Sequence, residues 1–166
     1  MAHILVLLRH AKAEPQGDLG DALRPLASKG RKQATALGPR LSGITGPVDV
    51  ALVSSALRAT ETLKLVRGGL AVRDHTVVDD LYQAGPRQVL TLLQELDEDA
   101  GTVLVVGHEP TISGLASLLH DSRDDLAKQI SLGVPTATAC ILRVPAPWRA
   151  LDRSVAHLTQ LVRPTH

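Results

Sequence analysis

The sequence predicts a three-layer α/β/α sandwich around a mostly parallel central sheet of about six strands, with one antiparallel edge strand. Two observations carry this prediction. Aliphatic runs without a polar face, at residues 4–8 and 102–106, suit strands that are buried on both sides. Segments with apolar residues at helical spacing lie between the strands, and the resulting order β-α-β-α-β-α-β-α-β-β is typical of a parallel sheet covered by helices.

The elements are expected in the following order. Residues 14–25 are rich in Pro, Gly and Asp and form a loop after the first strand, and Ser28 caps a helix over residues 28–42. Apolar periodicity places the remaining strands at residues 49–53, 72–78, 102–106, 136–144 and 154–161. The same periodicity places the remaining helices at residues 57–67, 86–96 and 110–120, with a short helix or loop at 121–129. The last two strands form an antiparallel pair joined by a turn at residues 145–148.

Composition narrows the classes of function. A length of 166 residues favours a single domain over residues 1–166. A net charge of +1 and only two aromatic residues, Tyr82 and Trp148, argue against a nucleic-acid or membrane-surface partner. The one cysteine, Cys140, excludes an intramolecular disulfide, and its apolar neighbours indicate a buried, inert thiol. No apolar run approaches the roughly 18 residues of a membrane span, and the N-terminal run is too short for a secretory signal, so a cytoplasmic location is expected.

Polar residues follow three of the predicted strands. Arg9 and His10 follow the first strand, Ser55 and Arg58 follow the second, and His108 follows the fourth. Because the carboxyl ends of parallel strands meet at one edge of a sheet, we expect these side chains to lie together, beside two helix amino termini. Arginine binds phosphate through a fixed fork of donors, and histidine can attack or transfer protons near neutral pH. The pattern therefore predicts a pocket for a phosphoryl group.

Three blocks of sequence resemble the signature of the histidine phosphatase superfamily, whose fold is that of phosphoglycerate mutase. They are LRHAK at residues 8–12, SSALRATET at residues 54–62 and VGHEP at residues 106–110. Arg24-Pro25-Leu26, followed by Gly30, is further similar to the short members that resemble bacterial phosphohistidine phosphatases. The resemblance covers about residues 5–113 and implies a phosphorylated substrate, carried by a protein or a small molecule. It implies no metal and no other cofactor.

The resemblance also implies a mechanism. His10 would attack phosphorus through a ring nitrogen and form a phosphohistidine intermediate that water hydrolyses. Arg9, Arg58 and a protonated or donating His108 would hold the non-bridging oxygens and take the place that Mg²⁺ has in kinases. A backbone carbonyl, with Gly17 as one candidate, would accept the other ring N–H of His10.

The remaining polar candidates have two readings each. Ser55 would either bind phosphate or cap the following helix. Lys12 and Arg24 are expected to be solvated or paired within the loop rather than to contact substrate.

Two positions depart from the family pattern. Ala11 stands in place of the glycine of the Arg-His-Gly motif, a small change that is compatible with close packing. Gln83 stands where larger relatives place a glutamate as general acid, and an amide cannot supply a proton. Asp80, Asp18 and Asp21 are the carboxylic alternatives, or the site has no acid. A protonated phosphoimidazole leaves as neutral imidazole, so a missing acid favours phosphohistidine over an alkyl phosphate.

The leading function is therefore a phosphatase acting on phosphohistidine of a protein or on a small activated phosphate. A small-metabolite phosphomonoesterase is the alternative. A phosphoglycerate mutase-like enzyme is disfavoured because mutases retain the acid and carry larger insertions. A non-catalytic phosphate-binding module is disfavoured because it has no need of a nucleophile. Short loops predict an open pocket, and only the edge strand near residues 155–161 could form a dimer surface, so a monomer or weak dimer is expected.

Overall fold

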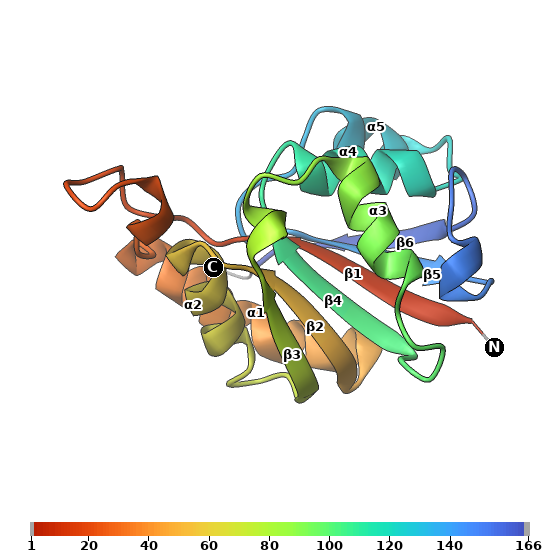
Figure 1. The fold of residues 1–166 in the computed structure, drawn as a ribbon, viewed down its shortest axis with the longest axis horizontal. Coiled ribbons are helices and arrows are strands. Elements are labelled where there is room, and N and C mark those ends of the chain that lie inside the picture. The colour runs from red at the N-terminus through yellow and green to blue at the C-terminus, as the bar shows by residue number, and fades with distance from the viewer. Residues whose placement is uncertain (1, 165–166) are drawn as a thin grey trace.

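The computed structural model describes residues 2–164 and shows a six-stranded sheet between two layers of helices (Figure 1). Helices α1 (Ser28–Thr45) and α2 (Leu57–Val66) cover one face. Helices α3 (Pro86–Gln94), α4 (Thr111–Leu119) and α5 (Asp125–Ser131) cover the other face. Each layer closes over its own cluster of buried apolar side chains. The three-layer α/β/α architecture is as predicted.

The sheet has the strand order β3-β2-β4-β1-β5-β6. Its strands are β1 (His3–Arg9), β2 (Val48–Ser54), β3 (Val72–Val78), β4 (Thr102–Gly107), β5 (Ala139–Val144) and β6 (His157–Val162). The first four are parallel, whereas β5 is antiparallel to both β1 and β6. The antiparallel strand β5 thus lies one place in from the edge, and the edge strand β6 runs in the direction of β1. The connection from β5 to β6 contains only the 3₁₀ helix η3 (Trp148–Ala150) and reverses the chain, so the two strands pair as antiparallel neighbours.

The unbroken aliphatic run of β1 follows from its central position. Leu5 and Leu7 belong to the cluster under α3, α4 and α5, whereas Val6 and Leu8 belong to the cluster under α1 and α2. All four side chains are at most 1% exposed. Successive side chains of a strand point to opposite faces, so a strand covered on both faces needs apolar residues at every position.

The parallel register aligns the strand ends that carry the candidate site. Arg9 of β1 lies opposite Gly107 of β4, and Val53 of β2 lies opposite Val106 of β4. The residues that follow these three strands therefore leave the sheet side by side, at the edge where ligands gather in open α/β sheets.

Some boundaries differ from the sequence-based prediction. Helix α1 has Ala27 rather than Ser28 as its N-cap, without a side-chain hydrogen bond, and it continues past Gly43 to Thr45. The predicted strand over residues 136–144 begins only at Ala139. The backbone N–H of Ala137 instead donates to the carbonyl oxygens of Arg9 and His10, both at 3.1 Å. Pairing with the end of β1 thus draws this segment away from regular sheet geometry.

Two other expectations concern reactivity and membranes. Cys140 is fully buried in β5, and burial raises the pKa of its thiol to about 12, which confirms an inert cysteine. Within residues 2–164, no helix combines the length and the apolar composition that crossing a bilayer requires.

Gly30 allows helix α1 to approach the segment that follows β1. A Cβ at Gly30 would lie 1.9 Å from the carbonyl oxygen of Lys12, whereas a Cβ at Gly43 in the same helix would meet nothing within 4 Å. We expect Gly30→Ala to lower the free energy of unfolding by about 1–3 kcal/mol, because the clash is with backbone. Gly43→Ala should leave it unchanged or raise it by up to about 1 kcal/mol. Denaturant titration measures both, and equal stabilities of the two variants would contradict this account.

Candidate active site

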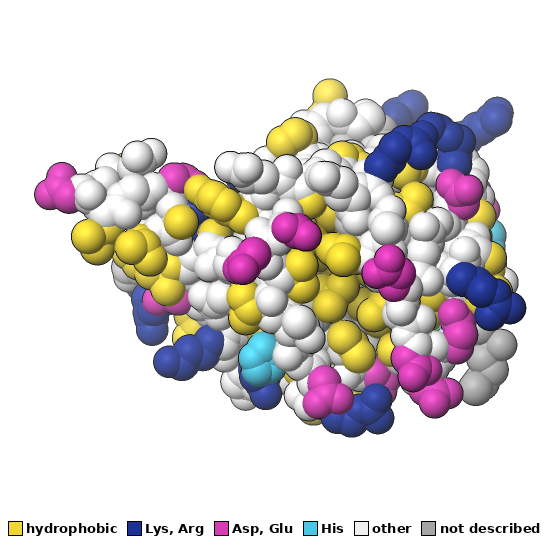
Figure 2. Space-filling model, viewed as in Figure 1, with side chains coloured by type: hydrophobic (Ala, Val, Ile, Leu, Met, Phe, Trp, Pro, Cys, Tyr) yellow, Lys and Arg dark blue, Asp and Glu magenta, His cyan; other side chains and the backbone are white. Residues whose placement is uncertain are grey.

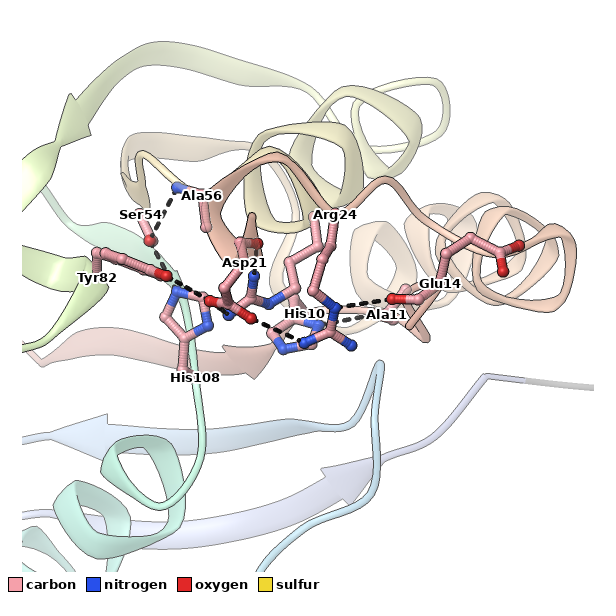
Figure 3. A network of polar contacts seen from close by, with 10 residues as sticks. His10, Ala11, Glu14, Asp21, Arg24, Ser54, Ala56, Tyr82 and His108 are labelled. Carbon is pink, nitrogen blue, oxygen red and sulfur yellow. Dashed lines mark hydrogen bonds and ion pairs between the residues drawn. The ribbon is translucent and has the colours of Figure 1, made fainter. Parts of the chain in front are cut away.

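The ends of β1, β2 and β4 bring Arg9, His10, Arg58 and His108 into one cluster. Figure 3 shows His10 and His108 of this cluster beside each other. The imidazole rings of His10 and His108 lie 5.2 Å apart between centroids, at an interplanar angle of 59°. Arg58 is the second residue of α2 and is 7% exposed. The side chains of the cluster thus come from segments that are far apart in sequence and meet at the predicted sheet edge.

His10 is oriented by the chain immediately after it. Its Nδ1 lies 2.7 Å from the carbonyl oxygen of Ala11, so this nitrogen carries the proton and donates it, and Nε2 keeps its lone pair. The Ala11 N–H in turn donates to Thr62 Oγ1 in α2 at 3.0 Å, which holds this turn in place. The expected backbone carbonyl is therefore present, but it belongs to Ala11, the next residue in the chain, and not to Gly17.

The environment of His10 favours its neutral form. Burial lowers the pKa of His10 from 6.5 to about 4, and the positive charges of Arg58, Arg9 and Arg24 act in the same direction. The hydrogen bond to the Ala11 carbonyl opposes this shift only in part. At neutral pH His10 therefore presents an unprotonated Nε2 among fixed positive charges, which is the form a nucleophile requires.

His108 is neutral for the same reason. Burial lowers its pKa to about 4, and repulsion from His10 when that ring is protonated, and from the charge of Arg58, acts in the same direction. His108 Nε2 lies 2.8 Å from Ser54 Oγ, which also accepts a hydrogen bond from the Ala56 N–H at 3.3 Å. The Ser54 hydroxyl proton can be donated to Nε2, which keeps the imidazole proton on Nδ1. Of the two expected forms, protonated or donating, the structure favours a neutral, donating His108.

Asp21 links the first loop to the cluster. It lies in the 3₁₀ helix η1 (Asp21–Leu23), and its backbone oxygen and its Oδ2 accept from the Nη1 and Nη2 atoms of Arg58 at 2.9 and 3.1 Å. Its carboxylate also accepts from Arg24 Nη1 at 3.0 Å and from the Tyr82 hydroxyl. The hydrogen bonds from Tyr82 and Arg24 and the charge of Arg58 lower its pKa to about 2. Asp21 is therefore ionised at neutral pH and cannot be the general acid.

The other acid candidates make no hydrogen bond to this network within the described residues. Asp80 is exposed in the 3₁₀ helix η2 (Asp79–Tyr82) and lines a groove of about 750 Å³ with Gln83. Acidic side chains flank an apolar floor on this face of the molecule (Figure 2). Asp18 is exposed on the loop that projects from the molecule (Figure 1). Within residues 2–164, neither carboxylate hydrogen-bonds to the residues around His10.

Ser55 is also outside the network. Its side chain is exposed, and α2 has Ala56 as its N-cap without a side-chain hydrogen bond, so the capping role expected for Ser55 was wrong. Its neighbour Ser54, the fully buried last residue of β2, contacts His108 instead. Alternation along the strand turns Ser54 toward the site, and the sequence pair alone did not show which serine that would be.

Sequence reasoning also missed Tyr82. Its ring meets the ring of His108 edge-on at 5.8 Å between centroids, and the Arg58 guanidinium carbon lies 5.8 Å from the Tyr82 centroid. The sequence offers one signal for Tyr82: it precedes Gln83, the position at which larger relatives have a glutamate as general acid.

The polar atoms without partners gather in this site. Among residues 2–164, three buried side-chain nitrogens make no hydrogen bond, namely Arg9 Nε, Arg58 Nε and His108 Nδ1. Buried polar atoms without partners are rare and often mark functional sites. Here they are N–H donors around a cationic cluster, and such a set fits the oxygens of an anion. The described residues contain no group of three or more His, Cys, Asp or Glu side chains that could hold a metal ion.

Comparisons with known proteins agree with this arrangement. The sequence profile of the histidine phosphatase superfamily (branch 1) matches residues 5–83. An uncharacterized protein of Mycobacterium tuberculosis is 35% identical over 161 residues, which cover 91% of this chain and 96% of that protein. The structure of SixA from Nakamurella multipartitia, named there as a proposed phosphohistidine phosphatase, is 31% identical with a TM-score of 0.86 and covers 100% of this chain and 98% of that one. The chain belongs to the histidine phosphatase superfamily.

A second solved structure extends the likeness in fold. The protein histidine phosphatase SixA complexed with tungstate has a TM-score of 0.80 at 22% identity, over 99% of this chain and 97% of that one. The family resemblance and the α/β fold expected from the sequence are thus confirmed. The family, together with the similarity to SixA, supports a phosphatase, which is a hydrolase.

The contacts of Asp21 predict that it orients Arg58 rather than donating a proton. Asparagine at this position would turn an NH₂ group toward at least one of the donors that the carboxylate now accepts. We expect Asp21→Asn to lower kcat/KM by about tenfold or more, as for the loss of a hydrogen bond to a charged group. Asp18→Asn, on the exposed part of the same loop, should leave kcat/KM unchanged. Similar values for Asp21→Asn and the unmodified protein would contradict the orienting role.

The lowered pKa of His10 predicts the acid side of the pH profile. Protonation blocks Nε2, so activity should be lost only as the pH falls through about 4, not through the ordinary histidine value of 6.5. The pH dependence of kcat/KM reports groups of the free enzyme. We therefore expect kcat/KM for a chromogenic aryl phosphate to show no histidine inflection near pH 6.5. If kcat/KM does show an inflection near pH 6.5 that the ionisation of the substrate does not explain, then burial does not hold His10 neutral.

Proposed function

We propose that this histidine phosphatase moves the phosphoryl group of a phosphohistidine first to His10 and then to water. The observation that carries the proposal is the set of three unpartnered buried donors, Arg9 Nε, Arg58 Nε and His108 Nδ1, gathered around a neutral His10. A phosphoryl group supplies oxygens to such donors, and Nε2 of His10 supplies the electron pair that phosphorus accepts.

The two steps balance with the groups of this site. In the first, the Nε2 lone pair of His10 forms an N–P bond while the N–P bond of the substrate breaks. The bond electrons pass to the substrate imidazole, which entered protonated and leaves neutral. In the second, water attacks phosphorus, and the electrons of the Nε2–P bond return to His10. Both protons of the water leave with the product as dihydrogen phosphate, which gives one of them up to the solvent. The Nδ1–H of His10 remains hydrogen-bonded to the Ala11 carbonyl in both steps, and this hydrogen bond keeps the ring in position.

Positive charge for both steps comes from side chains. Arg9 and Arg58 remain charged at any working pH, whereas His10 and His108 are neutral in the free site. The guanidinium groups thus stabilise the oxygens of the transferring group without protonating the nucleophile. They take the role that Mg²⁺ has in kinases, so we propose a reaction that needs no metal.

The choice of substrate follows from which groups of the site can donate a proton to a leaving group. Asp21 is ionised, Gln83 is an amide, and among residues 2–164 neither Asp80 nor Asp18 hydrogen-bonds to the network around His10. A leaving group that needs no proton from the enzyme is therefore favoured, and protonated phosphoimidazole is one. The similar SixA of Nakamurella multipartitia carries the name of a phosphohistidine phosphatase, which supports the same class. Asp80 stays the candidate donor for the alternative, a small-metabolite phosphomonoesterase.

Other sequence-based expectations stay predictions. They are a single domain over residues 1–166, a cytoplasmic location and a monomer or weak dimer. The identity of the phosphoryl donor, a protein or a small activated phosphate, is a prediction as well.

A substrate panel tests the proposal. We expect turnover of a phosphohistidine peptide to exceed turnover of an alkyl phosphate, because only the latter needs a proton on its leaving group. His10→Ala should remove at least about 10³ of the activity, and rapid quenching should trap acid-labile phosphate on His10 of the unmodified protein. A chelator should not change these rates. His75→Ala, which alters an exposed histidine on β3, serves as the control.

Two results would overturn the proposal. Faster turnover of the alkyl phosphate would show that the site supplies a proton, and equal activity of His10→Ala would exclude His10 as the nucleophile.

A further inference from the structure

Glu109, the residue after His108, has a carboxylate that the reaction proposed above does not use. Its Oε1 accepts from the Ser113 N–H at 2.7 Å, and its Oε2 accepts from Ser113 Oγ at 2.7 Å and from the Val134 N–H at 3.0 Å. It therefore joins the start of α4 to the turn that follows α5. These two segments are 25 residues apart in sequence at the Glu109–Val134 contact.

The turn held by Glu109 also holds Arg9. The carbonyl oxygen of Val134 accepts from Arg9 Nη1 at 2.9 Å, and Arg9 Nε makes no hydrogen bond. The backbone N–H of Arg9 donates to the Thr138 carbonyl at 3.1 Å, and the Ala137 N–H donates to the carbonyls of Arg9 and His10. The segment after α5 thus lies along Arg9 and His10, and the carbonyl oxygen of Val134 anchors the Arg9 guanidinium.

The turn is shaped around the carboxylate. Gly133 has φ +92°, in the left-handed region that favours glycine, and a Cβ there would lie 3.1 Å from Glu109 Oε2. The carboxylate therefore packs directly against this turn. Two of its hydrogen bonds tie it to Ser113 in α4, and the third holds the backbone of Val134, the residue whose carbonyl accepts from Arg9.

We propose that Glu109 is a positioning residue for Arg9. Through the Val134 backbone it holds the guanidinium in one orientation, with Nε–H free for a phosphoryl oxygen. A guanidinium on a flexible side chain loses rotamer entropy when it binds an anion, and a fixed carbonyl removes part of that cost beforehand. The inference rests on the proposed function only in taking a phosphoryl group as the ligand of Arg9.

Glu109→Gln is the informative change. An ionised carboxylate accepts all three hydrogen bonds, whereas the NH₂ group of glutamine would face the N–H of Ser113 or Val134. We expect the dissociation constant of inorganic phosphate, measured by calorimetry, to rise about tenfold, which is within the coupling seen between contacting groups. KM should rise with it, while kcat changes less.

A double-mutant cycle separates positioning from general destabilisation. In an Arg9→Ala background, Glu109→Gln should change the phosphate dissociation constant less than about twofold, because the side chain through which it acts is gone. Ser113→Ala removes one hydrogen bond from Glu109 but leaves the Val134 contact, so it should lower thermal stability without weakening phosphate binding. If Glu109→Gln does not fold, Glu109→Asp keeps the charge but shortens the reach and carries the same expectation.

The outcomes distinguish this inference from the proposed function. Unchanged phosphate affinity in the Glu109 variant, or an equal loss with and without Arg9, would overturn the positioning role while leaving the phosphatase proposal intact. Phosphate binding without turnover of any phosphohistidine peptide would overturn the proposed function alone. An unmodified protein that does not bind phosphate would overturn both.

Discussion

The parallel pairing of β1 with β4, and of β4 with β2, is the constraint on which the whole site depends. It places Arg9 opposite Gly107 and Val53 opposite Val106, so that three strands end at the same level. A slip of one residue would turn each strand's side chains to the other face and move His10 away from His108. The aliphatic residues that fill both faces of β1 therefore determine where the chemistry takes place, although none of them takes part in it.

Burial and charge act together at this edge. Burial keeps both histidines neutral, whereas the guanidinium groups of the arginines carry positive charge. An anion thus meets positive charge without a proton being transferred to the nucleophile. Asp21 balances part of this charge through Arg58 and Arg24, and the projecting loop contacts Arg58 through both the carboxylate and the backbone oxygen of this residue.

The surroundings of the site are organised from backbone as much as from side chains. The Ala11 carbonyl selects the tautomer of His10, the Val134 carbonyl anchors Arg9, and the Asp21 carbonyl accepts from Arg58. The Ala11 and Val134 oxygens lie in irregular segments after β1 and α5, and the Asp21 oxygen lies in the short 3₁₀ helix η1. Backbone groups in such segments hold their positions only when other contacts fix them, which Thr62 does for the turn after His10.

The sequence alone was enough to predict the layer architecture, the order of strands and helices, and the four residues that follow strands at the sheet edge, Arg9, His10, Arg58 and His108. Burial patterns and strand-end positions are local properties that a linear sequence records. The tertiary structure decided that Ser54 rather than Ser55 meets His108, that Asp21 is an ionised partner of Arg58, and that Tyr82 faces the site. These depend on the path of the loop over residues 14–25 and on which atoms lose contact with water. Contacts between distant segments set both, and residue type alone does not specify them.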